Sequence, residues 1–545
     1  MLFERDRILE GFFLILLVGL LLYSGLAVIW DNKIEHPYPW GYYATDAFQH
    51  QTRAQWIKDQ GNYLLEAPYY SSNLNNIVGF YPPILNHVAV LLSIVSGFEV
   101  YDTIQIIIFL CALFGALTMY LIISDFNKKV AILSLPFVLF LFALNGSRVG
   151  WLWGHWPSLV GNFFLVAFLW SMIKFEKVKK PYFLIALFLS GAFMAHTVFA
   201  IFAILFIVLY FFFTNKKKEY FKTIILSSFI CFVATAYFVN IFVNTWLRIQ
   251  PYHFSIITSL QGFGDVLNLT DFGYSSIFVF AGLLISLFIL LKQREKAVFA
   301  SLFFVLIGFT NYVGFERRAF NLRFFWPITL SFFFGITIYF LIKKYSVLTK
   351  KEISLTHFLF LGVFLTISIF YSLSDKYISG GSAGLMNPPV WDTLTWIEKN
   401  SPQNSTVFYS YGDFYDQFAL VANSKRVAVR MQTEDFVDSL KKNIIKRNYK
   451  AWMYSEYGAG LPYKTGTFSF SLKAHEDMSL TSDKETDFCL MNYLVFDKVS
   501  RYPELAKYNL LIANKLLNHI QFEIVHQNEL SLIIKNNNVE DECIQ

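Results

Sequence analysis

Three side chains that could do chemistry stand close together in the stretch TDAFQHQTRAQW, soon after the first long apolar run. Asp46, His50 and Arg53 follow one another at spacings of four and three residues, so a helix would place them on one face. A carboxylate can take the proton of an attacking hydroxyl group, and a histidine beside it could hydrogen-bond the carboxylate or touch an anionic substrate. An acid here is also typical of a solvated helix start, and an interfacial helix favours basic residues anyway. The spacing alone therefore leaves both interpretations open.

Arginines form a second candidate group in the stretch FERRAFNLRFF. Arg323 lies inside the apolar run NLRFFWPITL, where a charge is costly and usually has a partner. A guanidinium group suits phosphate oxygens because it can hold two of them at once. We therefore expect Arg323, with Arg318, to bind a lipid phosphate at the level of the outer head groups. Contact with ordinary head groups would explain at least one of Arg317 and Arg318.

A third group is the tryptophan-rich stretch SRVGWLWGHWPS. Its candidates for contact with a substrate are Arg148, Trp151, His155 and Trp156. Tryptophan belts are common at membrane interfaces without any site, so a structural role is equally open. Asp413, among the tyrosines of YSYGDFYD, is a further candidate for contact with a substrate.

The composition excludes an ordinary soluble protein. Hydrophobic residues make up 55% of the 545 residues, 61 of them phenylalanine, and the mean hydropathy is +0.45. Apolar segments occur at 8–30, 84–98, 104–124, 130–145, 158–173, 181–195, 198–213, 222–246, 274–291, 297–314, 320–342 and 355–373. The four cysteines are scattered and predict neither a disulfide framework nor a metal cluster. The net charge of +6 is modest, and we expect no nucleic-acid partner.

The charges between the apolar segments predict the topology. The basic connections lie at 127–129, 174–180, 215–222, 292–296 and 343–351. The positive-inside rule places all of them in the cytoplasm together with the N-terminus, provided that 84–98 does not cross. That segment is short and begins at a Pro-Pro pair, which is typical of a re-entrant or interfacial helix. The sequence therefore predicts a multi-pass protein of the cytoplasmic membrane with about eleven crossings and its polar loops outside.

The chain divides into a membrane module, 1–373, and an extracytoplasmic α/β domain, 374–545. The membrane module has a large first external loop, 31–83, which carries Asp46. In the second part PPVWDTLTWIEKNSP predicts a helix, and STVFYS, RVAVRM and NYLVFD predict strands. FEIVHQ and LSLIIK predict a hairpin around Gln527 and Asn528.

These motifs, taken in order, resemble the GT-C superfamily of membrane glycosyltransferases. The resembling stretches are TDAFQHQTRAQWIKDQGNY after the first apolar helix, GFYPPILNHVAVLLSIVSG, SRVGWLWGHWPSLVGNFFL and WIEKNSPQNSTVFYSYGDFYDQFALVANSKRVAV. The last is similar to the start of the extracytoplasmic domain in oligosaccharyltransferase-like relatives. The resemblance implies a GT-C-like fold and transfer of a sugar from a polyprenyl-phosphate carrier. It also implies that Tyr81 opens the next helix beside the substrate and that Arg323-Phe324 holds the donor phosphate.

Two features depart from that family. Asp46 has no adjacent carboxylate, and the Trp-Trp-Asp-Tyr-Gly hallmark of oligosaccharyltransferases is absent. We therefore do not expect recognition of Asn-X-Ser/Thr acceptors, and the acceptor could be a glycan, a lipid or a protein. The need for a metal is also open, because a divalent cation could be held by Asp46 with Glu66 or Asp413.

The sequence thus predicts a glycosyltransferase with its cleft at the outer membrane face. Asp46 would act as the base, assisted by His50, while Arg323, Arg318 and Arg53 would hold the donor phosphate. The main alternative is a transporter or flippase of lipid-linked glycans, which would need polar residues near the bilayer midplane. A non-catalytic lipid-binding assembly subunit is the other alternative.

Overall fold

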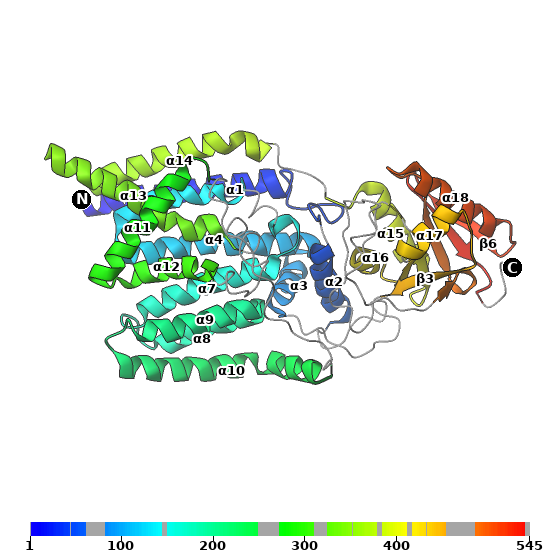
Figure 1. The fold of residues 1–545 in the computed structure, drawn as a ribbon, viewed down its shortest axis with the longest axis horizontal. Coiled ribbons are helices and arrows are strands. Elements are labelled where there is room, and N and C mark those ends of the chain that lie inside the picture. Colours follow the sequence, from blue (N-terminus) through cyan, green and yellow to red (C-terminus); the bar gives the residue numbers. More distant parts are fainter. Residues whose placement is uncertain are drawn as a thin grey trace.

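The computed structural model describes residues 2–43, 45–61, 82–143, 150–248, 272–309, 324–350, 352–378, 384–410, 412, 417–431, 433–453 and 485–539. A bundle of helices occupies one part of the molecule and an α/β unit the other (Figure 1). The N-terminus lies at the end of the bundle that is remote from the α/β unit.

The bundle is built from helices of very different length. They are α1 (Leu2–Ile29), α2 (Thr45–Gln60), α3 (Ile84–Ser96), α4 (Val100–Phe126), α5 (Lys128–Ser134), the 3-10 helix η1 (Leu135–Leu141), α7 (Trp156–Lys174), α8 (Pro181–Ala195), α9 (Thr197–Phe211), α10 (Lys217–Arg248), α11 (Ser275–Gln293), α12 (Lys296–Phe309), α13 (Trp326–Thr349) and α14 (Leu355–Ile378). Proline in the first turn starts α7, α8 and α13, where its missing N–H costs no hydrogen bond.

Seven helices among the described residues are long and apolar enough to cross a membrane. They lie at Asp6–Ile29, Val100–Phe126, Trp156–Lys174, Lys217–Asn240, Ser275–Gln293, Trp326–Thr349 and Leu355–Asp375. The predicted segment 130–145 is not one straight helix, because α5 passes into η1 at Leu135-Pro136. The seven long helices indicate a polytopic membrane protein. The apolar helices α8, α9 and α12 are shorter, so the count of eleven crossings stays a prediction.

Helix α3 corresponds to the segment that we expected not to cross. Its 13 residues span roughly 20 Å at 1.5 Å per residue, less than the roughly 30 Å of a hydrocarbon core. Gly97, with φ +79°, ends the helix, and α3 packs against α2 and α4. The length agrees with an interfacial or re-entrant helix.

The basic connections gather at one end of the bundle. Their lysines pair with acids of neighbouring helices and turns: Lys128–Glu10, Lys174–Asp125, Lys177–Asp125 and Lys296–Glu176. Thr214 Oγ1 donates to Glu176, 3.1 Å away, and so joins the α9–α10 connection to them. This end also holds the N-terminus (Figure 1). Which side of the membrane it faces stays a prediction.

The α/β unit contains a seven-stranded mixed sheet in the order β4-β3-β2-β1-β5-β7-β6. Its elements are α15 (Pro388–Asn400), β1 (Thr406–Tyr409), α16 (Gln417–Ser424), β2 (Val427–Met431), α17 (Thr433–Lys442), β3 (Asn448–Met453), β4 (Glu485–Asp487), η6 (Phe488–Leu490), β5 (Tyr493–Asp497), α18 (Pro503–Leu517), β6 (Phe522–Gln527) and β7 (Ser531–Asn536). Strand β1 pairs in parallel with β2 and β5, and β6 pairs antiparallel with β7. The predicted helix, strands and hairpin are all confirmed.

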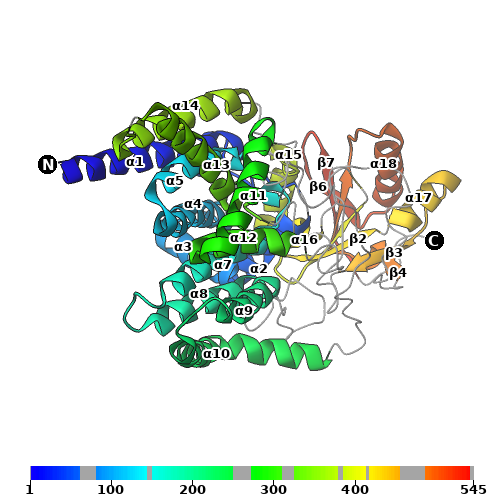
Figure 2. The ribbon, with the colours of Figure 1, turned by 60° about the vertical axis from the view of Figure 1, so that its left-hand side comes forward.

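Alternation along the strands divides the buried residues between the two faces of the sheet. Val407 and Tyr409 of β1 belong to the core that continues into the helical bundle, whereas Phe408 belongs to a second core with Tyr508 and Ile512 of α18. Figure 2 shows the sheet between α15 and α16 on the bundle side and α17 and α18 on the far side. The α/β unit therefore shares one core with the membrane module.

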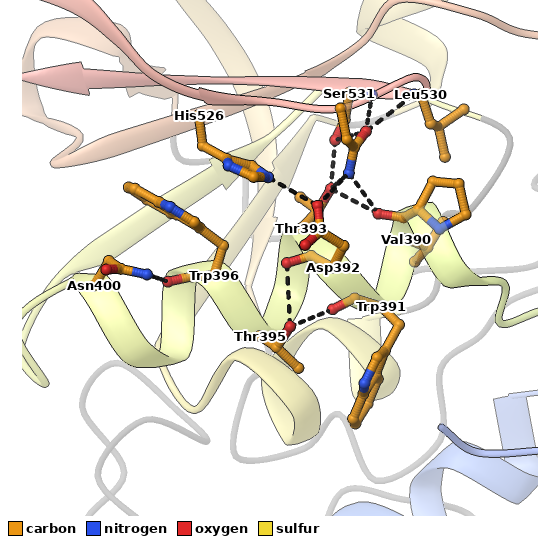
Figure 3. A network of polar contacts seen from close by, with 12 residues as sticks. Val390, Trp391, Asp392, Thr393, Thr395, Trp396, Asn400, His526, Leu530 and Ser531 are labelled. Atoms are coloured by element: carbon orange, nitrogen blue, oxygen red, sulfur yellow. Dashed lines mark hydrogen bonds and ion pairs between the residues drawn. The ribbon is translucent and has the colours of Figure 1, made fainter. Parts of the chain in front are cut away.

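Polar contacts fix α15 to the β6–β7 hairpin (Figure 3). His526 Nε2 and Asn528 Nδ2 each lie 2.9 Å from Asp392 Oδ2, and Asn528 Nδ2 also donates to Thr393 Oγ1. The Trp396 ring stacks on His526 with 5.3 Å between centroids. Burial alone would raise the pKa of Asp392, but the hydrogen bonds from Asn528 and His526 hold that pKa below its usual value.

Candidate functional site

Helix α2 carries the first candidate group and is almost wholly enclosed. Residues 47–56 are buried, including Phe48 and Trp56, whereas the side chain of Asp46 in the first turn is 51% exposed. The helix predicted for TDAFQHQTRAQW is therefore present, with both aromatic side chains turned towards protein. Because α2 packs against α3, α4 and α16, it lies between the bundle and the α/β unit (Figures 1 and 2).

Tyr42, four residues before Asp46, fixes the approach to α2. Its carbonyl accepts a hydrogen bond of 2.8 Å from Leu385 N at the start of the α/β unit. Its hydroxyl donates to the carbonyl of Tyr101, 3.0 Å away, and its ring packs on Trp156 at 4.9 Å. The first loop, the bundle and the α/β unit therefore meet at one residue just before the candidate base.

The turn before α7 presses directly on the first turn of α2. Gly154 has φ +87°, and a Cβ atom there would lie 2.2 Å from Ala47 N. The next residue, His155, places Nδ1 3.7 Å from Asp46 Oδ2 and is 10% exposed. Only glycine fits this close approach, so the turn holds His155 at ion-pair distance from Asp46.

His50 and Arg53 lie on the buried side of α2. The exposed fraction of His50 is 2%, and its ring lies 5.9 Å from that of Trp156. Burial lowers the pKa of His50 well below its usual value, and the nearby Arg53, His155 and His196 lower it further. His50 is therefore neutral near pH 7 and cannot supply positive charge to a phosphate. Its assistance to Asp46 stays a prediction.

Two of the predicted tryptophans support the turn from inside. Trp151 and Trp156 are buried, Trp151 Nε1 donates to Gln105 Oε1, and Trp156 Nε1 donates to the carbonyl of Trp151 at 2.5 Å. Contact of these two with a substrate therefore stays a prediction. The exposed indole of the motif is Trp153, at 47%, which sequence reasoning did not select.

Several predicted site residues lie outside the described part of the chain. They are Tyr81, Arg148, Arg318, Arg323 and Asp413, together with Arg317 and Glu66. The residues just after Arg323 are described: Phe324 is buried against Phe199, with 5.1 Å between ring centroids, and Phe325 N donates to Asn162 Oδ1. Among the described residues no group of three or more His, Cys, Asp or Glu side chains could hold a metal ion.

A buried polar contact that the sequence did not reveal joins the first loop to α4. His36 Nδ1 lies 2.8 Å from Asp102 Oδ1, and its Nε2 lies 3.0 Å from the carbonyl of Trp30. His36 N also donates to Asp102 Oδ2, and Tyr101 Oη donates to the carbonyl of His36. The sequence offered two signals for this contact, namely Asp102 directly before an apolar run and His36 in HPYPW. Because 66 residues separate them, the sequence does not show that they pair.

No model of a known protein family matches the sequence, and no curated protein does. Several solved structures share its architecture. The apo structure of ArnT from Cupriavidus metallidurans matches with a TM-score of 0.56 at 10% identity, covering 96% of this chain and 98% of that one. The oligosaccharyltransferase AglB from Archaeoglobus fulgidus matches with 0.54 at 14%, covering 77% and 64%. The arabinofuranosyltransferase AftD from Mycobacteria matches with 0.54 at 11%, covering 98% and 40%.

The chain has a GT-C-like fold. ArnT, AglB and AftD are all GT-C glycosyltransferases, so the resemblance inferred from the sequence is confirmed at the level of the fold. Identities of 10–14% show the fold alone. This chain spans 64% of the length of AglB and 40% of AftD, but nearly all of ArnT.

Proposed function

We propose that this protein is a membrane glycosyltransferase that moves a sugar from a polyprenyl-phosphate donor to an acceptor hydroxyl group. One observation carries the proposal: Asp46 is a half-exposed carboxylate at the start of an otherwise buried helix, held next to the α/β unit. The similar structures support the donor class, since one is ArnT bound to undecaprenyl phosphate and another is AglB with an inhibitory peptide and a dolichol-phosphate.

In the proposed reaction Asp46 takes the proton of the acceptor hydroxyl as its oxygen bonds to the anomeric carbon of the sugar. The bond between that carbon and the lipid phosphate oxygen breaks, and its electron pair leaves with the phosphate. Negative charge grows on the departing phosphate, and Arg323, Arg318 and Arg53 are proposed to stabilise it. Arg148, Trp151, His155, Trp156, Tyr81 and Asp413 are proposed to line the donor and acceptor sites.

The proposed function also requires a particular orientation of the protein in the membrane. The lysine-rich end of the bundle, with the N-terminus, would face the cytoplasm, and α2 with the α/β unit would face outward. The donor, acceptor and membrane lipids are its expected partners.

Replacement of Asp46 by Asn tests the proposal. Asparagine keeps the shape of the side chain but cannot accept the proton, so turnover should fall by about 10²–10⁴-fold while donor binding changes little. The matched control is Asp59→Asn at the other end of α2, where the carboxylate pairs with Lys425 at 3.6 Å. Transfer should be measured in proteoliposomes with a polyprenyl-phosphate sugar. Near-normal transfer by a well-folded Asp46→Asn protein would reduce this residue to a helix-start acid.

A further inference from the structure

Residues 31–43, here named the strap, lie between α1 and α2 and lead the chain to Asp46. We propose that His36 is a positioning residue for transfer: as an imidazolium bound to Asp102, it holds the strap on the bundle and so sets where α2 begins. The inference rests on the proposed function, because it assigns a role in transfer to a residue outside the candidate site.

Both ring nitrogens of His36 face oxygen atoms. Nδ1 lies 2.8 Å from Asp102 Oδ1, and Nε2 lies 3.0 Å from the carbonyl oxygen of Trp30. The backbone N–H of His36 donates to the other carboxyl oxygen, Asp102 Oδ2, at 3.0 Å. The side chains of His36 and Asp102 are 3% and 2% exposed, so bulk water does not compete for these bonds. Because a neutral imidazole has only one N–H, two hydrogen bonds from the ring require one further proton on the pair.

That proton could lie on the imidazole, giving an ion pair, or on the carboxyl group, giving a neutral pair. Three features favour the ion pair. Free imidazole binds a proton about 400-fold more tightly than a free aspartate carboxylate. Asp102 lies in the first turn of α4, where the helix dipole favours negative charge. Trp40 stacks on the His36 ring with 5.5 Å between centroids and 12° between planes, an arrangement that favours a flat cation.

Tyr101, the neighbour of Asp102 in α4, binds the strap at two points. Its hydroxyl donates to the carbonyl of His36 at 2.8 Å, and its carbonyl accepts from the Tyr42 hydroxyl at 3.0 Å. Between these points the strap contains two prolines, each of which fixes a φ angle. The first turn of α4 therefore sets the path of the strap from His36 to Tyr42.

The end of the strap leads directly into α2. The carbonyl of Tyr42 accepts from Leu385 N at 2.8 Å, Tyr43 N donates to Leu152 O at 3.1 Å, and Asp46 follows in the first turn of the helix. Without the imidazole the strap keeps these contacts with the α/β unit and with the turn before α7, but it loses its anchor on α4. The chain should then stay folded while the start of α2 shifts, and a shift of about 1 Å costs about 10²-fold in rate.

Substitutions on both sides of the contact separate this anchor from simple packing. His36→Ala and Asp102→Ala each remove hydrogen bonds of the strap. Asp102→Asn keeps them, because its amide oxygen accepts from His36 N and its amide N–H donates to Nδ1 of a neutral imidazole, whose Nε2–H still donates to Trp30. The matched control is Arg447→Ala, which removes a charged hydrogen bond of 2.7 Å to Asp487 within the α/β unit.

Hydrogen exchange of the strap amides, measured by mass spectrometry in nanodiscs, reports the anchor without any transfer. These amides should exchange at least about tenfold faster in His36→Ala and Asp102→Ala than in the wild type, and at the wild-type rate in Asp102→Asn and in the control. Unchanged exchange in both alanine variants overturns the anchor. If melting in detergent shows that the alanine variants do not fold, Tyr101→Phe removes only the bond to the His36 carbonyl and should give a smaller acceleration. Unchanged exchange in Tyr101→Phe then overturns the anchor.

Histidine ring-nitrogen NMR at about pH 7 tests the charge. The histidine whose signals differ between the wild type and Asp102→Asn is His36. It should carry protons on both ring nitrogens in the wild type and on one in the variant. A single protonated nitrogen in both proteins overturns the ion pair.

Turnover with a polyprenyl-phosphate sugar tests the role in transfer. In His36→Ala and Asp102→Ala, kcat should fall by about 10- to 100-fold while KM for the donor changes by less than about twofold. Asp102→Asn should recover most of the wild-type kcat. Faster exchange together with a wild-type kcat overturns the positioning role. Absence of transfer by the wild-type protein overturns the proposed function instead, while exchange still decides whether His36 holds the strap.

Discussion

Replacement of Gly154 by alanine should damage the candidate site more than its size suggests. The added Cβ would lie 2.2 Å from Ala47 N, whereas atoms in good contact stand about 3.5–4.0 Å apart, so turn and helix must separate by more than about 1 Å. A side chain at the positive φ of +87° costs about 1–2 kcal/mol, and overpacking costs about 1–3 kcal/mol. The variant should therefore be less stable than the wild type by about 2–5 kcal/mol.

Gly61→Ala is the matched control at the other end of α2. Gly61 also has a positive φ of +68°, but no atom of the described residues lies within 4 Å of a Cβ built there. This variant should therefore carry only the backbone cost of about 1–2 kcal/mol. Thermal unfolding in detergent measures both, and transfer should fall by about 10²-fold in Gly154→Ala alone, since a displacement of 1 Å at the site has that effect. Equal melting temperatures and equal transfer in the two variants would refute the close-approach argument.

Two further predictions concern the α/β unit. Gln51 Nε2 donates to Asn423 Oδ1 at 2.7 Å across the α2–α16 contact. A double-mutant cycle of the two alanine variants should therefore give a coupling free energy of about 0.5–1.5 kcal/mol in unfolding experiments. Additive effects of the two substitutions would contradict this hydrogen bond. Hydrogen bonds hold the pKa of Asp392 in the folded protein below its value of about 4 in the unfolded chain. The ionised carboxylate therefore stabilises the fold above about pH 4, and this stabilisation is lost as the pH falls through the pKa of the folded state. In the Asp392→Asn variant the melting temperature should therefore fall less between about pH 5 and pH 3 than in the wild type. An equal fall in the two proteins would exclude this contribution of Asp392.

Local patterns were enough to predict most of the elements. Apolar runs predicted the membrane helices, because a segment that buries its backbone in lipid must be apolar along its length. Short apolar runs predicted strands β1, β2 and β5 and the β6–β7 hairpin, because a short apolar run rich in β-branched and aromatic residues is typical of a strand. The Pro-Pro pair marked where α3 begins. Each of these features depends on neighbours in the chain.

The sequence by itself determined the polytopic class, the one-sided lysine-rich connections and the identity of Asp46 as a candidate base. Only the tertiary structure decided which side chain faces that base. Helical spacing favoured His50, but packing against Trp156 turns His50 into the core, while Gly154 brings His155 to Asp46 from a segment more than 100 residues away. Likewise the bond between Gln51 and Asn423 spans 372 residues. Such contacts arise from the shared core of bundle and sheet, and the order of residues along one helix cannot reveal which distant turn will press against it.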